Sequence, residues 1–169
     1  EFEASFESAT NVVYYSFKPQ NNVSKWTGSK NDLKSIYVLT DFNVSPMATL
    51  VAIPTTWGLH VIDEVCLYSS NTDEMVKEIQ NRYPHQKVTC YPDPAGTQRK
   101  TSAGGRTDIS ILQNAGWDVR YKPRHPAVKD RINAVNSLLL NSNGDSRLLI
   151  DPKCKQLIKC LTRFSYKEN

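Results

Sequence analysis

The sequence predicts an α/β fold in which one mixed sheet is flanked by helices. Three short apolar runs with tight connections occupy residues 35–67, which is the pattern of an antiparallel meander. From residue 72 onward, helical periodicity alternates with strand-like runs, and a strand that arrives from a helix joins its sheet in parallel. With 169 residues, the chain is long enough to be a single domain with its own hydrophobic core.

The meander opens with residues 35–44, an apolar run that Pro46 ends, and continues with strands at residues 49–53 and 59–67. A run as apolar as the first is expected to be buried on both faces of the sheet. It carries one carboxylate, Asp41, and a buried carboxylate needs a metal, a cationic partner or several hydrogen-bond donors. The simpler alternative is a hydrogen-bonded Asp at a strand end.

The rest of the chain alternates between helices and strands. The predicted elements are, in order, a helix at 72–83 with Thr72 as its N-cap, a strand at 87–91, a helix capped by Thr107, a strand at 117–121, a helix at 127–140, a short extended segment at 147–150 and a last helix opened by Asp151-Pro152. Residues 1–34 are expected to form a lead-in arm and loop, with a short strand at 12–17. Three antiparallel strands followed by alternating helices and strands is the ribonuclease-H-like order. The alternative is a generic α/β sandwich.

The composition sets limits on compartment and partners. The net charge of +4 and the sequence pI near 8.9 permit an anionic partner without demanding one. No apolar run is long enough to cross a bilayer and no signal-peptide pattern is present, so neither secretion nor a membrane partner is expected. The four cysteines form no CxxC pair, which favours free thiols in a reducing compartment. A first residue of Glu1 instead of Met indicates a fragment or a processed product.

Two carboxylates lie in or directly after predicted strands of the sheet. Asp41 lies in the first strand, and Asp93 follows the fourth strand between two prolines. The two strands are neighbours in a ribonuclease-H-like sheet, so both carboxylates could reach one divalent cation. Oxygen ligands of this kind suit Mg²⁺ or Mn²⁺, and two such ions about 4 Å apart can activate water for attack on a phosphodiester. The alternative for Asp93 is an ordinary turn residue.

Other polar residues are weaker candidates. Asp151 is a possible third metal ligand, but Asp-Pro is a common helix start, so an N-cap role is favoured. The pair Asp63-Glu64 either supports the metal ligands from behind or forms the solvent-facing edge of the third strand, and the edge is favoured. The three histidines show no spacing typical of metal ligands, and no nucleotide-binding loop or nucleophile signature is present.

Basic residues gather in two segments near the second half of the chain. They are either a solvated face or a rim that contacts phosphates beside the carboxylates. The candidates for contact with nucleic acid are Arg99, Lys100, Arg106, Lys122, Arg124, Lys129 and Arg131.

Five pieces of the chain together resemble the C-terminal nuclease domain of the large terminase subunit of tailed bacteriophages. They lie in the family's order over nearly the whole chain. The pieces are residues 1–7 (EFEASFE), 41–47 (DFNVSPM), 93–96 (DPAG), 128–136 (VKDRINAVN) and 150–154 (IDPKC).

The resemblance implies a ribonuclease-H-like fold and metal-dependent cutting of double-stranded DNA during viral genome packaging. The family's metal ligands in the first strand and after the fourth strand match Asp41 and Asp93. An upstream ATPase domain, a portal protein and a small terminase subunit are the implied partners, and the host cytoplasm is the implied location. The third acidic ligand of the family lies in a His-x-x-Asp-Ala-like motif that residues 1–169 do not contain, so it is expected beyond residue 169.

Two alternatives stay open at this stage. One is a catalytically incomplete module that binds or docks on DNA, which the missing third ligand favours. The other is a different ribonuclease-H-like nuclease, such as a resolvase or transposase, which would prefer branched or end-specific DNA.

Overall fold

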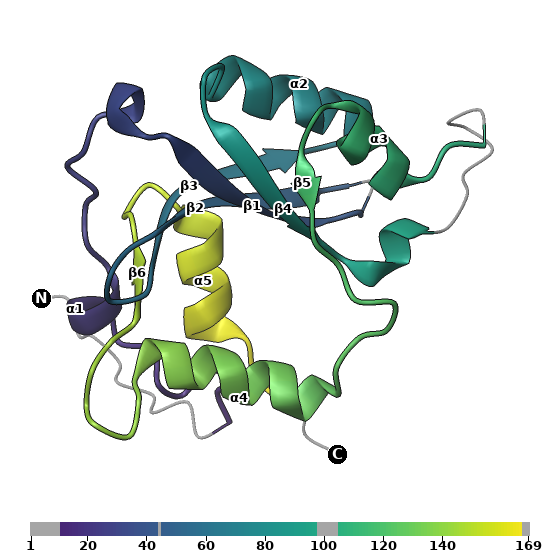
Figure 1. Ribbon diagram of the computed structural model, residues 1–169. Helices are drawn as coiled ribbons and strands as arrows, with labels where there is room; N and C mark the ends of the chain where they lie inside the picture. The colour runs from purple at the N-terminus through teal and green to yellow at the C-terminus, as the bar shows by residue number, and fades with distance from the viewer. Residues whose placement is uncertain (1–10, 44, 98–104, 167–169) are drawn as a thin grey trace, which may run out of the picture.

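The computed structural model describes residues 11–43, 45–97 and 105–166 and contains a six-stranded mixed sheet (Figure 1). The spatial order of the strands is β5-β4-β1-β2-β3-β6. Their bounds are β1 Ser35–Asp41, β2 Met47–Pro54, β3 Leu59–Leu67, β4 Lys87–Pro92, β5 Asp118–Val119 and β6 Leu148–Ile150. β1, β2 and β3 are antiparallel, whereas β4 joins β1, β5 joins β4 and β6 joins β3 in parallel. The predicted mixed sheet is therefore confirmed.

Helices cover the two faces of this sheet. Their bounds are α1 Pro19–Asn22, α2 Thr72–Arg82, α3 Asp108–Asn114, α4 Val128–Leu139 and α5 Lys155–Arg163, with short 3₁₀ turns at Lys30–Asp32 and Pro94–Thr97. Figure 1 shows α2 and α3 on one face and α4 and α5 on the other. None of the helices in the described ranges is both long enough and apolar enough to cross a membrane.

Each face of the sheet has its own apolar core. On the α2 and α3 side, Ile36 and Val38 of β1 pack with buried residues of α2 and α3. On the α4 and α5 side, a smaller cluster includes Ala52, Ile150 and Leu161. This second cluster lies toward β2, β3 and β6, so it leaves the end of β1 open to solvent.

The expectation that β1 is buried on both faces is therefore wrong. Its side chains alternate, and Leu39 and Asp41 are exposed on the α4 and α5 side. Asp41 is the last residue of the strand, which ends three residues earlier than the predicted run at 35–44. Local hydrophobicity could not show this, because the exposure depends on where the distant helices α4 and α5 cover the sheet.

The start of α2 differs from the prediction by one residue, whereas the start of α3 agrees with it. The N-cap of α2 is Asn71, whose side chain accepts from Glu74 N at 3.0 Å, while the Thr72 hydroxyl donates to Asp108 Oδ1 at 2.6 Å. The predicted cap of α3 by Thr107 is confirmed, and Ser110 completes a capping box.

The predicted N-cap role of Asp151 is wrong, because α5 begins at Lys155 with Cys154 as its N-cap. Asp151 instead accepts hydrogen bonds from the backbone N–H groups of Trp26 (2.9 Å) and Lys153 (3.0 Å). It therefore ties the turn before α5 to the N-terminal segment. The partner that decides its role lies 125 residues away in sequence.

The interpretation of Asp63 and Glu64 as a solvent-facing edge is also wrong. Asp63 is buried, and it accepts from Tyr83 Oη at 3.0 Å and from Arg82 Nη1 at 3.2 Å. Burial and the charge of Asp63 raise the pKa of Tyr83. Glu64 accepts from the first free amides of α5, so a strand carboxylate stabilises the positive end of a helix.

The N-terminal segment departs from the predicted short strand at 12–17. Val12 makes a single antiparallel bridge with Ser165, and α1 follows where a loop was expected. The first part of the predicted lead-in arm, residues 1–10, lies outside the described residues. The four cysteines are free thiols, as their spacing predicted.

Candidate metal and nucleic-acid site

Asp41 and Asp93 lie side by side at the ends of adjacent parallel strands. Thr40 of β1 pairs with Pro92 of β4, and Asp93 N donates to Thr40 O at 3.0 Å. The next residue on each strand is one of the two aspartates, and neighbouring strands run about 4.8 Å apart. Both aspartates line one open cleft with a volume of about 530 Å³. The structure therefore brings the two predicted carboxylates together.

The turn after β4 holds Asp93 in place. Its Oδ1 accepts from Ala95 N at 2.7 Å, and its carbonyl accepts from Gly96 N at 3.0 Å, at the start of the 3₁₀ turn. The ring of Phe42, which follows Asp41, packs directly on Gly96 and leaves no room for a Cβ atom there. The segments that follow both aspartates are thus packed against each other.

The electrostatics of the pair favour a cation. Partial burial raises the pKa of the Asp41 carboxyl, and the negative charge of Asp93 raises it further, while His125 acts in the opposite direction. Asp41 Oδ2 also accepts from Asn43 Nδ2 at 2.8 Å. Two carboxylates that repel each other bind a shared cation favourably, because the cation removes the repulsion.

The donor set fits a hard divalent ion such as Mg²⁺ or Mn²⁺, since both groups offer carboxylate oxygen and the lining of the cleft includes no cysteine. Among the residues that the structure describes, no group of three His, Cys, Asp or Glu side chains is arranged to hold a metal. The site therefore offers two carboxylates. Water and substrate oxygens can complete the coordination of a cation at these two carboxylates.

Asp151 does not reach this cleft. Ile150 pairs with Val61, Val61 with Ala52, and Ala52 with Tyr37. Asp151 therefore lies three strands from β1 and several residues short of the level of Asp41.

His125 is the cleft residue that the sequence pattern did not identify. Its Nε2 lies 3.2 Å from Asp93 Oδ1, and its side chain is 44% exposed. It belongs to the connection between β5 and α4, residues 120–127. No sequence spacing links it to Asp93; the one local signal is the following Pro126, which favours an extended approach.

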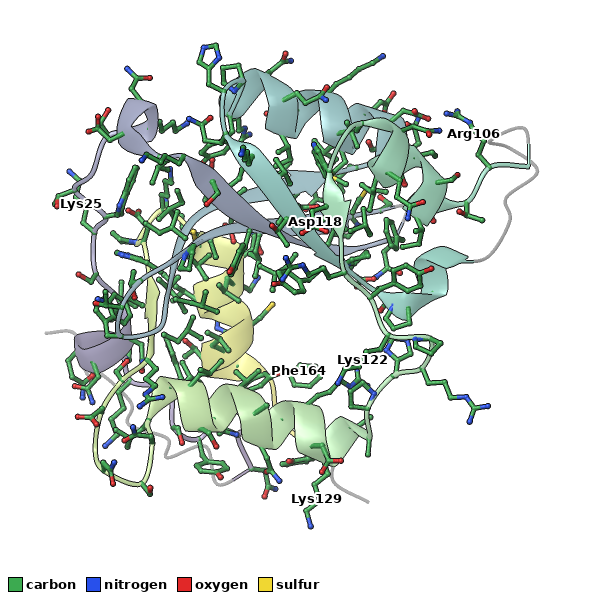
Figure 2. The ribbon with its side chains drawn as sticks, in the orientation of Figure 1. Lys25, Arg106, Asp118, Lys122, Lys129 and Phe164 are labelled. Atoms are coloured by element: carbon green, nitrogen blue, oxygen red, sulfur yellow. The ribbon has the colours of Figure 1, made fainter. Side chains whose placement is uncertain are left out.

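The predicted basic residues fall into three groups. Arg131 of α4 lines the cleft with Asp41 and Asp93. Lys122, Arg124 and Lys129 are exposed, and Figure 2 shows Lys122 on the connection between β5 and α4, with Lys129 on the side of α4 that points away from the sheet.

Arg106 lies beside α3, on the opposite face of the sheet, and pairs with Asp73 of α2 at 3.2 Å (Figure 2). The structure does not bring it to the cleft. Arg99 and Lys100 lie outside the described residues.

The floor of the cleft is apolar. Leu39, Ala48 and Leu50 come from β1 and β2, and Tyr91 from β4 packs edge-on against Tyr37 with ring centroids 5.4 Å apart. An apolar floor beside the carboxylates strengthens electrostatic interactions made above it.

Comparison with known proteins agrees with this architecture. The model of the terminase RNaseH-like domain family matches residues 40–169, and the chain belongs to this family. The ribonuclease-H-like fold predicted from the order of elements is confirmed. A search of curated protein sequences found no match.

Large terminases and their nuclease domains are among the solved structures with a similar fold. The large terminase from a thermophilic bacteriophage gives a TM-score of 0.72 at 15% identity over 94% of this chain, which spans 38% of that protein. The P22 large terminase nuclease domain gives a TM-score of 0.66 at 14% identity, and the match covers 95% of this chain and 82% of the P22 domain. The nuclease domain of the bacteriophage SPP1 large terminase, g2p, was solved with bound Mn. It gives a TM-score of 0.59 at 12% identity, and the match covers 88% of this chain and 80% of the SPP1 domain.

Proposed function

We propose that residues 1–169 form one nuclease domain that cuts double-stranded DNA during viral genome packaging, with Mg²⁺ or Mn²⁺ held by Asp41 and Asp93. One observation carries the proposal: two carboxylates whose negative charges repel each other open on the same cleft, at the ends of adjacent strands. The bound Mn of the SPP1 domain supports the choice of a divalent cation.

The residues of the chain then have distinct roles. Asp41 and Asp93 bind the metal, which when present lowers the pKa of water and stabilises negative charge on a phosphodiester. Arg131, within the same cleft, neutralises the phosphate that is to be cut. Lys122, Arg124 and Lys129 contact the DNA backbone around it, and such contacts do not depend on base sequence.

The partners follow from the family and are part of the proposal. The chain spans 38% of the large terminase from the thermophilic bacteriophage, a protein that has also been solved with ATP-γ-S. We infer that an ATPase domain, a portal protein and a small terminase subunit act together with this domain in the host cytoplasm.

Nicking of supercoiled plasmid in Mn²⁺ tests the proposal. The wild-type domain is expected to relax the plasmid, and Asp41→Asn is expected to lose this activity because one of the two ligands loses its charge. Asp118→Asn, an exposed strand carboxylate paired with Arg120, makes the same charge change away from the cleft and should remain active. Equal nicking by Asp41→Asn and wild type would contradict the assigned site.

A second candidate function is a DNA-binding module that does not cut. The observation that favours it is the presence of two metal-ligating carboxylates, with no group of three among the described residues. This second function would be supported if DNA binding weakens with salt, does not change with Mn²⁺, and is not accompanied by nicking.

A further inference from the structure

We infer that His125 is a positioning residue that ties the connection between β5 and α4 to Asp93, so that DNA binding by this connection and metal binding by Asp93 support each other. The inference rests on the function proposed above. It starts from the contact of 3.2 Å between His125 Nε2 and Asp93 Oδ1.

This contact determines which oxygen of Asp93 is available. Oδ1 already accepts from Ala95 N at 2.7 Å, and the ring nitrogen of His125 is its second neighbour. Both of these contacts are made by Oδ1. A carboxylate oxygen that accepts from a backbone N–H and lies against a ring nitrogen is restricted in orientation, which leaves the other oxygen for a cation.

The same contact anchors a basic segment. At its start, Arg120 N donates to Cys90 O at 2.8 Å, and α4 begins at Val128. Between residues 121 and 127, which the structure describes completely, the contact of His125 with Asp93 is the one hydrogen bond or ion pair that reaches the sheet. The side chains of Lys122 and Arg124, on either side of Pro123, are exposed.

Two consequences follow from this arrangement. Without His125, the segment gains conformational freedom, so DNA contacts by Lys122 and Arg124 cost more ordering entropy. Without His125, Asp93 also loses one of the neighbours that orient it, which for groups behind a metal ligand typically costs about tenfold in metal affinity. Because coupling between two sites is reciprocal, binding at either one should favour binding at the other.

The test compares four proteins: wild type, His125→Ala, His125→Gln and His85→Ala. Glutamine places an amide N–H near the position of Nε2 and carries no titratable group, so it can restore the contact. His85 is an exposed histidine that lines a different pocket and serves as the matched control. Two quantities are measured: the dissociation constant of Mn²⁺ by calorimetry without DNA, and the affinity for a short fluorescent duplex in EDTA. Thermal unfolding verifies that each variant is folded.

His125→Ala is expected to weaken Mn²⁺ binding about tenfold and to weaken metal-free DNA binding severalfold, with glutamine restoring most of both. Unchanged values in His125→Ala, or a loss that glutamine does not restore at all, would overturn the inference. If the wild-type domain binds Mn²⁺ and nicks plasmid while His125→Ala behaves identically, the inference fails and the proposed function stands. If wild type binds no Mn²⁺, the proposed function fails, and the EDTA measurement alone decides whether His125 anchors the segment.

Discussion

Replacing Asp93 by asparagine should make the metal-free domain more stable and remove its response to Mn²⁺. Asparagine keeps the Oδ1 acceptor that Ala95 N uses, so the turn after β4 should survive. What is lost is the negative charge that raises the pKa of Asp41 from the neighbouring strand. The two negative charges destabilise the domain when no cation is bound, but both are needed to bind one. Asp93→Asn should therefore raise the stability of the metal-free domain and abolish its further stabilisation by Mn²⁺.

The size of the effect follows from the spacing of the strands. Unit charges about 5 Å apart repel by about 0.8 kcal/mol in water and about 3 kcal/mol at an effective dielectric constant of 20. Asp41 is exposed and the Asp93 side chain is 28% exposed, so screening by solvent favours the lower end, about 1 kcal/mol. In a domain of this size, 1 kcal/mol shifts Tm by about 2–4 °C.

Thermal unfolding with and without Mn²⁺ measures both effects. At about ten times its dissociation constant, Mn²⁺ should stabilise the wild-type domain by about 1.4 kcal/mol. In EDTA, Asp93→Asn should unfold about 2–4 °C above wild type, and Mn²⁺ should leave its Tm unchanged. Asp118→Asn should have the Tm of wild type in EDTA, and its Tm should still increase when Mn²⁺ is added. A Tm of Asp93→Asn in EDTA below that of wild type, or a full response to Mn²⁺, would refute the reasoning.

Three further predictions concern the surroundings of the site. Gly96→Ala should destabilise the domain by about 1–3 kcal/mol in urea unfolding, because a Cβ there meets an aromatic ring; an unchanged midpoint would contradict the close packing. Arg131→Ala should reduce the slope of log K against log salt for DNA binding by about one, whereas Arg106→Ala, which removes a residue paired on the other face, should not. Burial raises the pKa of Cys90 and Cys154 to about 12, so a thiol reagent at pH 8 should reach these two only after denaturation; their rapid labelling in the native protein would contradict the packing.

Much of the fold could be predicted because its signals are local. The bounds of β3 follow from one apolar run between turn residues, and the start of α3 from Thr107, whose partner Ser110 lies three residues away. The parallel pairing of β1 and β4 follows from a helix between strands. Since the prediction placed Asp41 in the first of these strands and Asp93 directly after the second, their meeting could also be predicted.

The features that were missed depend on residues far apart in sequence. Glu64 caps α5 from 92 residues away, and Asp151 is held by Trp26. The exposure of Asp41 depends on how far the helices α4 and α5 extend across the sheet, which no local pattern contains. His125 reaches Asp93 only because the connection after β5 returns to the end of β4.

The most direct test of the metal site is anomalous diffraction from crystals of the domain soaked in Mn²⁺. We expect the strongest Mn peak within coordinating distance of carboxylate oxygens of both Asp41 and Asp93, and the loss of this peak in Asp41→Asn crystals. A strongest peak elsewhere, for example at Asp63 or Asp151, or a peak that persists unchanged in Asp41→Asn, would contradict the central claim that these two strand ends form the metal site.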